Sequence, residues 1–211
     1  MQTERVSEAV IRRLPRYYRH LLQLKANGVE RISSGSLAQQ MRLNASQVRQ
    51  DFNCFGGFGQ QGYGYRVDTL LMEIKNILSL NGRHKVVIVG AGNIGQALAH
   101  FEGFEKDGFA VTALFDIDER LVGRDINGKP VLHIDELEGY IRENGADIGV
   151  IAARRSAAQE IADRMAAAGV AGIWNFAPVD VVAPVPVEQV HMSDSIICLS
   201  YKIAHRDAAE E

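Results

Sequence analysis

The fold is decided by residues 85–95, which read Lys85-Val86-Val87-Ile88-Val89-Gly90-Ala91-Gly92-Asn93-Ile94-Gly95. The short apolar run predicts a buried strand, and the Gly-x-Gly-x-x-Gly pattern after it is typical of a turn that opens a helix. Gly90 permits a tight turn, Gly92 lets the backbone approach a pyrophosphate, and Gly95 lets helix and strand pack closely. Free N–H groups at the helix start, together with the helix dipole, attract phosphate. The stretch therefore predicts a dinucleotide-binding βαβ unit.

An acidic residue supports this prediction and indicates which dinucleotide binds. Asp116 lies 21 positions after Gly95, at the end of the second apolar run. Its carboxylate can accept hydrogen bonds from the ribose hydroxyls of adenosine, and its charge would repel a 2′-phosphate. We therefore predict that NAD(H) is the cofactor, held by Gly90, Ala91, Gly92, Asn93, Ile94, Gly95 and Asp116. The alternative is a glycine turn in an α/β domain that binds no ligand.

The second half of the chain alternates apolar runs with helical stretches. The apolar runs cover 85–89, 109–115, 147–152 and 170–174, and the helical stretches cover 94–105, 135–144 and 156–168. Strands that alternate with helices predict parallel βαβ units, and continuous apolar strands are expected where helices cover both faces of a sheet. A last helix is predicted over 193–205. It follows an extended stretch that contains Pro178, Pro184 and Pro186, so it is free to pack away from its own domain.

The first half predicts a helix-turn-helix. Apolar spacing predicts a helix over 7–25, although Pro15 leaves open a helix that begins only there. A second helix is predicted to follow Ser34 or Ser36. Asn44 is expected to cap a third helix, with Gln47 three residues on as in a capping box. Two short helices joined by a tight turn, the second rich in polar side chains, are typical of DNA-binding proteins.

A glycine-rich stretch follows these helices. Five glycines lie between positions 56 and 64, with aromatic residues between them. Each glycine costs a helix interior about 1 kcal/mol relative to alanine, so the stretch predicts a tight hairpin, the wing. Helical spacing returns over 66–81, and Asn81-Gly82 marks a boundary. We predict a winged helix DNA-binding domain over 1–82, a Rossmann domain over 83–190 and a C-terminal helix and tail over 191–211.

Charge is distributed unevenly along the chain. Residues 1–84 carry 12 Lys and Arg against 6 Asp and Glu, whereas residues 85–211 carry 11 against 20, within a net charge of −3. Such asymmetry indicates a nucleic-acid-binding module joined to something else, although a chance imbalance gives the same count.

Composition and motifs narrow the class of protein further. The chain has no apolar run of about 18 residues and no signal-peptide pattern, so we expect a cytoplasmic protein without a membrane span. Cys54 and Cys198 fit neither a disulfide framework nor a metal site. None of the six histidines lies in an evident catalytic motif, and residues 85–190 leave no room for a separate substrate domain. Catalysis is therefore disfavoured, and a domain that senses its cofactor fits better.

Six motifs occur in order along the chain: Arg13-Leu14-Pro15, Val48-Arg49-Gln50-Asp51-Phe52, Phe55-Gly56 through Gly62-Tyr63-Gly64-Tyr65, Gly90–Gly95, Phe115-Asp116 and Asn175-Phe176-Ala177-Pro178. With a winged head and a single Rossmann domain, they resemble the bacterial Rex family of redox-sensing transcriptional repressors. The resemblance implies a homodimer that binds a palindromic operator through two winged heads and represses genes of fermentation or anaerobic respiration. NADH would release the DNA, NAD⁺ would be compatible with binding, and the C-terminal helix would be swapped between subunits.

The resemblance also implies roles for particular residues. Base edges would be read at the start of the recognition helix by Ser46, Gln47, Arg49 and Gln50, because Arg suits guanine and Gln suits adenine. The wing would contribute Gln60, Gln61 and Tyr63. Candidates for phosphate or interface contacts are Arg12, Arg13, Arg16, Arg19 and Arg31. The cofactor site beyond the glycine turn would include Phe101, Phe176 and Pro178.

The chain departs from the family's usual residues in several places. Cations are replaced by Gln50, Gln60 and Gln61, which predicts weaker attraction to phosphate. Phe101 and His191 stand where the family commonly has Tyr and Asp, and that Asp pairs with an arginine that corresponds to Arg19. Asp194 is a candidate replacement, so we assign Arg19, His191 and Asp194 to a switch. Arg154 and Arg155 follow the fourth strand, where they contact either cofactor phosphate or solvent.

Two other functions stay open. One is a small NAD-dependent oxidoreductase whose basic head only dimerises, and the other is a ligand-binding regulatory subunit without DNA contact. The glycine-aromatic wing favours the DNA-binding sensor, because an enzyme has no need of a polar recognition helix beside a wing.

Overall fold

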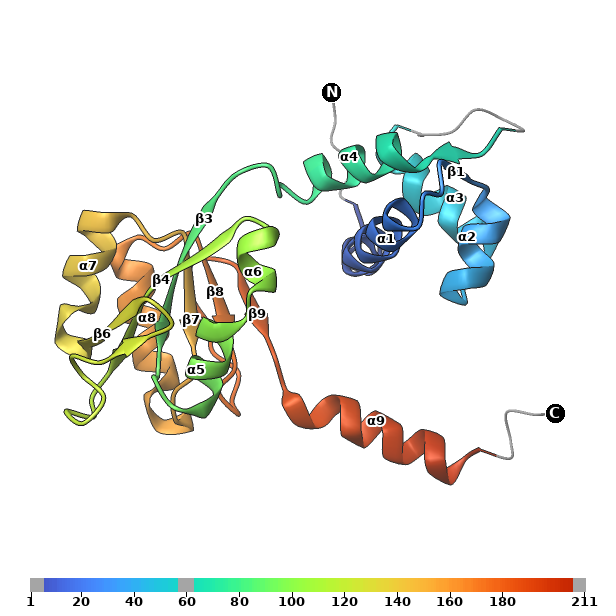
Figure 1. Cartoon of the computed structure of the whole chain (residues 1–211). Helices are drawn as coiled ribbons and strands as arrows, with labels where there is room; N and C mark the ends of the chain where they lie inside the picture. The colour runs from blue at the N-terminus through green and yellow to red at the C-terminus, as the bar shows by residue number, and fades with distance from the viewer. Residues whose placement is uncertain (1–5, 57–62, 207–211) are drawn as a thin grey trace. The chain divides into compact units, whose positions relative to one another are not determined.

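The computed structural model describes residues 6–56 and 63–206 and divides the chain into two compact units (Figure 1). We call Met1–Gly82 the head and Arg83–Glu211 the Rossmann unit. The division falls at Asn81-Gly82, where the sequence marks a boundary. Each unit has a hydrophobic core of its own, so each is described separately.

Four helices and two short strands make up the described part of the head. In chain order they are α1 (Glu8–Ala26), β1 (Arg31–Ile32), α2 (Ser34–Met41), α3 (Ala45–Asn53), β2 (Tyr65–Arg66) and α4 (Val67–Ile77). Fully buried Tyr17, Leu37, Phe52 and Ile74 bring all four helices onto one core. The two neighbouring helices α2 and α3 are the predicted helix-turn-helix.

Helix α1 runs unbroken through Pro15, so the alternative of a helix that begins there is wrong. Proline removes one backbone hydrogen bond from a helix interior. Here Leu14 and Tyr17, on either side of it, are buried in the same core and hold the helix together.

The predicted capping box at the start of α3 is also wrong. Asn44 occupies the N-cap position, but its side chain makes no capping hydrogen bond. The Gln47 amide instead donates from Nε2 to Oδ1 of Asp51, at 2.9 Å. A buried carboxylate one turn further along therefore takes the side chain that a capping box would need.

The wing is described only at its base. β2 pairs antiparallel with β1, so that Ile32 lies opposite Tyr65. Residues 57–62, which include the wing positions Gln60 and Gln61, lie outside the described residues. Tyr63 is exposed, and its carbonyl accepts a hydrogen bond from Nη1 of Arg31 at 3.2 Å.

A seven-stranded sheet in the order β5-β6-β4-β3-β7-β8-β9 forms the centre of the Rossmann unit. Its strands are β3 (His84–Val89), β4 (Phe109–Asp116), β5 (Asp125–Ile126), β6 (Lys129–His133), β7 (Ile148–Ile151), β8 (Gly172–Asn175) and β9 (Val187–Gln189). All neighbours pair in parallel except β5 with β6. The predicted α/β class with a parallel sheet is therefore confirmed.

Helices cover both faces of this sheet, and each face has its own core. They are α5 (Asn93–His100), α6 (Gly103–Lys106), α7 (Leu137–Asn144) and α8 (Ala158–Ala168), with single 3-10 turns at Ile134–Glu136 and Arg155–Ala157. The single helix predicted over 94–105 is two helices, because Phe101 leaves the helical conformation. The apolar runs in the sequence did not predict β5, β6 and β9, which are short strands at the two edges of the sheet.

The last helix, α9 (Met192–Ala204), has no buried residue (Figure 1, red). Its exposed apolar residues include Ile196, Ile197, Tyr201 and Ile203, each at least 63% exposed. Burying such side chains is worth about 2 kcal/mol each, so a bare apolar helix indicates a missing partner surface. Within the described residues, no helix has the length and apolar character needed to cross a membrane.

Candidate functional site

The glycine turn joins β3 to α5 and is too tight for side chains at two of its glycines. Gly90 has a φ of +105°, and a Cβ there would meet the carbonyl group of Ala152 after β7. A Cβ on Gly95 would meet the carbonyl oxygen of Gly90, because the first turn of α5 packs directly on the strand end. Gly92 differs, since a Cβ there would meet no atom of the chain within 4 Å. The backbone at Gly92 therefore borders open space at the start of α5, where a phosphate fits.

Asp116 lies beside this turn, as predicted from its spacing. Its Oδ2 accepts a hydrogen bond from the Ala91 N–H at 2.7 Å, and its Oδ1 accepts one from the Asp118 N–H at 2.9 Å. A carboxylate has about four acceptor positions, so Asp116 keeps capacity for ribose hydroxyls. The structure thus brings the predicted set 90–95 and 116 together where β3 and β4 end.

The three predicted aromatic and proline residues do not form one group with the turn. Phe101 ends α5 and is 58% exposed, so the helix separates it from the glycines. Its ring contacts Phe104, which contacts Trp174, which in turn contacts Phe176, with ring centroids 4.9, 5.7 and 4.5 Å apart. Phe176 and Pro178 follow β8, at the edge where the parallel strands end.

The two arginines after β7, Arg154 and Arg155, differ in their contacts. Arg155 donates from Nη2 to the carbonyl oxygen of Pro178 at 2.8 Å. Arg154 is exposed at the start of the 3-10 turn. The Arg155 guanidinium is thus bound to the loop after β8, which disfavours a contact between Arg155 and cofactor phosphate.

Residues Asn175 and Gln189 hold that loop, and sequence reasoning assigned neither to a site. Asn175 is fully buried and donates from Nδ2 to the Val179 carbonyl and to Oε1 of Gln189, both at 2.7 Å. The sequence signal for Asn175 is its place just before Phe176-Ala177-Pro178, since an amide side chain at the end of a strand commonly forms hydrogen bonds with the backbone of the following loop.

The predicted switch residues lie in different units. His191 occupies the N-cap position of α9 without a capping hydrogen bond from its side chain, and its Nε2 lies 2.7 Å from Oδ1 of Asp180. Asp194 is exposed in the first turn of α9, where its N–H donates to the His191 carbonyl at 3.1 Å. Arg19 belongs to α1 in the head, where it lines a basic cavity of about 280 Å³ with Arg16 and Arg42. His191 thus has a carboxylate partner that sequence reasoning did not identify.

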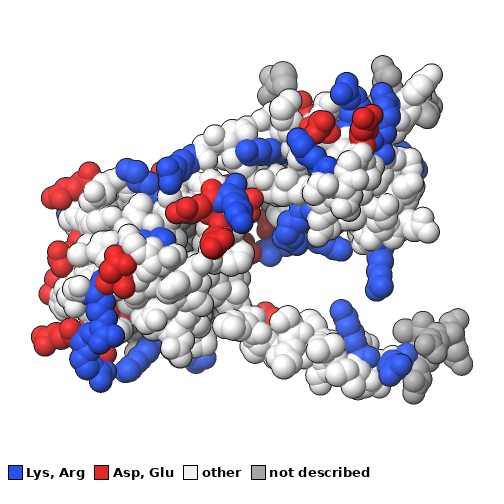
Figure 2. All heavy atoms as spheres, in the orientation of Figure 1, with Lys and Arg blue, Asp and Glu red and all other residues white. Residues whose placement is uncertain are grey.

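The candidate nucleic-acid interface is the solvent side of α3. Ser46, Arg49 and Gln50 are exposed there, and Arg49 Nη1 donates to Oγ of Ser34 at 3.3 Å, which links α3 to the start of α2. Figure 2 shows several Lys and Arg side chains over the head on the face in view. Gln47 departs from the prediction, because it is half-buried with its amide N–H turned to Asp51.

Two predicted phosphate contacts are involved in other interactions. Arg13 donates from Nε and Nη2 to the two oxygens of Asp51, each at 2.7 Å, so it is a structural residue rather than a free surface cation. Arg12 pairs with Glu8 at 3.0 Å on the exposed face of α1. Arg16 is exposed, and its Nη2 reaches the Met41 carbonyl at 3.4 Å.

Asp51 is the centre of a buried polar cluster between α1 and α3. Burial alone would raise the pKa of Asp51, but hydrogen bonds from Arg13, Tyr17 and Gln47 outweigh it and hold the pKa below its ordinary value. Burial and the neighbouring carboxylate raise the pKa of the Tyr17 hydroxyl, which donates to Asp51 Oδ2 at 2.8 Å. The cluster fixes the orientation of α3 from its inner side.

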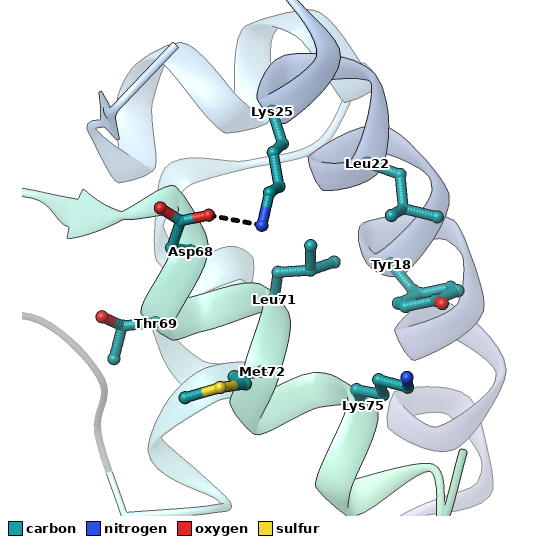
Figure 3. Close-up of a pocket in the computed structure, with 8 residues that line it drawn as sticks. All are labelled: Tyr18, Leu22, Lys25, Asp68, Thr69, Leu71, Met72 and Lys75. Atoms are coloured by element: carbon teal, nitrogen blue, oxygen red, sulfur yellow. Dashed lines mark ion pairs between the residues drawn. The ribbon is translucent and has the colours of Figure 1, made fainter. Parts of the chain in front are cut away.

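A groove of about 480 Å³ lies between α1 and α4 on the head (Figure 3). Its apolar walls come from Tyr18 and Leu22 on α1 and from Leu71 and Met72 on α4. At one end Lys25 Nζ and Asp68 Oδ1 form an ion pair at 2.8 Å. Met72 is 62% exposed, so the groove offers apolar surface to a partner.

Comparison with known proteins agrees with this division of the chain. Residues 81–179 match the CoA binding domain family, and residues 5–53 match a family described as a DNA-binding protein N-terminus. A redox-sensing transcriptional repressor Rex from Clostridium tetani is 50% identical over 198 residues, which are 93% of this chain and 94% of that protein. A second one, from Clostridium botulinum strain Alaska E43, is 46% identical over 204 residues, 96% of this chain and 97% of that protein.

Solved structures of RSP, a Rex-family repressor, share the fold over nearly the whole chain. RSP in complex with β-NAD⁺ and operator DNA has a TM-score of 0.91 at 46% identity, covering 97% of this chain and 95% of that chain. RSP in complex with β-NADH has a TM-score of 0.90 at 43% identity, covering 98% of each chain. The predicted resemblance is confirmed, and the chain belongs to the Rex family of redox-sensing transcriptional repressors.

Proposed function

We propose that this protein binds operator DNA as a homodimer in the cytoplasm and that NADH releases it, so that transcription follows the ratio of NADH to NAD⁺. The observation that carries the proposal is the open backbone at Gly92 in the same chain as an α3 whose outer face is exposed and polar. The protein acts as a regulator rather than an enzyme, because its relatives are named transcriptional repressors.

The proposed cofactor is NAD(H). Its pyrophosphate would lie against the N–H groups at the start of α5, residues 92–94, and its adenosine ribose against Asp116. When bound, it supplies a nicotinamide ring whose charge differs between the oxidised and reduced forms. That ring would lie towards Phe176 and Pro178, which follow β8 on the far side of the turn from Asp116. In support, structures of RSP contain β-NAD⁺ in one case and β-NADH in another.

The proposed DNA contacts come from the head. Ser46, Arg49 and Gln50 would reach base edges from α3, and Arg16 with the wing residues Gln60, Gln61 and Tyr63 would contact the backbone. The RSP structure that contains operator DNA supports this assignment for a relative with the same fold.

The proposed homodimer uses α9. This helix exposes apolar residues along its length, and a swap that buries it on a second copy would satisfy them. The groove between α1 and α4 is an apolar surface of the kind that binds amphipathic helices, so it is the proposed binding surface for α9 of the second copy. Arg19 on the head and His191 and Asp194 at the N-terminal end of α9 would form the switch.

The test is fluorescence anisotropy on labelled palindromic operator DNA, with NADH and NAD⁺ titrated separately. We expect tight binding without cofactor or with NAD⁺ and a large loss of affinity with NADH. Absence of operator binding under every cofactor condition would refute a DNA-binding sensor. Oxidation of NADH by any small carbonyl compound, followed by absorbance, would favour the oxidoreductase instead.

A further inference from the structure

The loop over residues 176–186 is fixed by two side-chain amides that lie side by side. Asn175 ends β8, and its Oδ1 accepts from the Ala177 N–H at 3.0 Å while its Nδ2 donates to Val179 and to Gln189. Gln189 ends β9 and donates in turn from Nε2 to the Val181 carbonyl at 2.8 Å. The Asn175 amide is fully buried and Gln189 is half-buried, and such amides tolerate little movement, because a lost hydrogen bond leaves a polar group unpaired.

The same loop contacts the N-terminal end of α9. β9 leads directly into that helix, and the N–H of Val190 donates to the Asn175 carbonyl at 2.8 Å. One residue later His191 occupies the N-cap position just before α9, and its Nε2 lies 2.7 Å from Oδ1 of Asp180 in the loop. Asp180 is the carboxylate that pairs with the His191 ring. The direction in which α9 leaves the sheet is therefore set by contacts with this loop.

The other end of the loop lies at the cofactor edge of the sheet. Strand order reverses between β3 and β7, and dinucleotides bind across the crevice at such a point. If Asp116, at the end of β4, holds the adenosine ribose, the nicotinamide lies over the ends of β7 and β8. Phe176 is the first residue there, and its N–H donates to the Ile151 carbonyl at 2.8 Å.

We propose that Asn175 and Gln189 are positioning residues that couple the nicotinamide end of the cofactor site to the first turn of α9. This inference rests on the proposed function. A ligand shifts an equilibrium only through contacts that differ between states, and the charged oxidised ring differs from the neutral reduced ring at this end of the site. A displacement of Phe176–Pro178 reaches β9 through the amide pair and α9 through Asp180 and His191. In the proposed swapped dimer, the change in α9 is then transmitted to the head of the second copy.

The test compares two glutamine variants of the full chain. Gln189→Met keeps the length of the side chain and removes the link between the loop and β9. Gln159→Met is the matched control, since Gln159 binds the same loop at both the N–H and the carbonyl of Val182 but does so from α8. For each variant we would measure operator affinity with and without NADH by anisotropy, and NADH affinity by calorimetry.

We expect Gln189→Met to reduce the effect of NADH on operator affinity by about five-fold or more, a typical size for coupling between sites. NADH affinity and cofactor-free operator affinity would change by less than about two-fold, and Gln159→Met would keep the full effect of NADH. An unchanged NADH effect in Gln189→Met overturns the proposal. So does an equal loss in Gln159→Met, because the effect would then come from a loosened loop.

A second variant decides the matter if Gln189→Met folds poorly. Asp180 is exposed, so Asp180→Ala leaves the core intact while it removes the contact with His191. We expect it to weaken the NADH effect in the same direction, and an unchanged effect overturns the proposal. Failure of the proposed function is a distinct result, because the unaltered chain would then show no operator binding or no response to NADH.

Discussion

Arg13 on α1 holds both carboxylate oxygens of Asp51 on α3, with Nε and Nη2 each 2.7 Å from an oxygen. Asp51 is fully buried, and the Arg13 side chain is only 21% exposed. The two residues that flank Asp51 in the chain have opposite surroundings, since Gln50 is exposed and Phe52 is buried. The pair therefore anchors the inner face of the helix whose outer face we assign to the operator.

Removal of one partner of this pair is expected to destabilise the head strongly. Arg13→Met leaves a buried carboxylate without its cation, at a cost of about 3 kcal/mol in the free energy of unfolding. The double variant Arg13→Met/Asp51→Leu removes both charges and should recover most of that loss. Urea unfolding followed by circular dichroism measures both. A double variant no more stable than Arg13→Met would show that the other hydrogen bonds of the cluster, from Tyr17 and Gln47, dominate.

The same cluster predicts a loss of stability in acid. The pKa of Asp51 is lower in the folded head than in the unfolded chain, where it is about 3.9. The unfolded state then binds protons first, so the contribution to stability is complete above about pH 4 and disappears as pH falls through the folded pKa. Unfolding free energies measured at several pH values from 6 down to 2 check this. Asp51→Asn should flatten the dependence, and an equally steep curve in that variant would assign it to other carboxylates.

The long periodic elements and the glycine turn could be predicted from the sequence because their signals are local. The turn needs glycine at 90 and 95 for steric reasons that any Rossmann unit shares. Gln47 and Arg13 were misassigned because polar side chains on an amphipathic helix look alike in sequence. Only the fold brings Asp51, 38 positions away from Arg13, into contact with it. Asn175 and Gln189 were missed for the same reason, since their pairing depends on the register of β8 and β9.

Two glycines of the turn are expected to respond differently to alanine. Gly92→Ala meets open space and has an ordinary φ of −76°, so folding and operator binding should persist. The added methyl group would occupy the approach of the pyrophosphate and weaken NADH binding by about ten-fold or more. Gly95→Ala collides with the Gly90 carbonyl and should lower the melting temperature as well. Calorimetry with NADH and thermal melts distinguish the two. NADH affinity unchanged in Gly92→Ala would count against a phosphate at this turn.

Arg49 is expected to carry specificity for the operator. Arg49→Ala should weaken binding to the operator by about 1–3 kcal/mol and relax the preference for it over unrelated DNA. Arg142→Ala is the matched control, because Arg142 is an exposed arginine on α7 of the Rossmann unit to which no DNA contact is assigned. Anisotropy on operator and scrambled duplexes, at several salt concentrations, measures affinity and specificity together. If Arg49→Ala lowers affinity for both duplexes equally, Arg49 contacts phosphate and not bases.

The apolar face of α9 and the groove on the head should both be required for the dimer. Ile197→Glu puts a charge on α9, and Met72→Glu puts one in the groove between α1 and α4. Each charge would need to be desolvated on association, which costs several kcal/mol, so each variant should shift the protein towards monomer. Ile117→Glu is the control, since Ile117 is also largely exposed, at 73%, but lies outside both surfaces. Sedimentation equilibrium gives the dissociation constants. If Ile197→Glu dissociates the dimer and Met72→Glu leaves it intact, α9 binds a surface other than this groove.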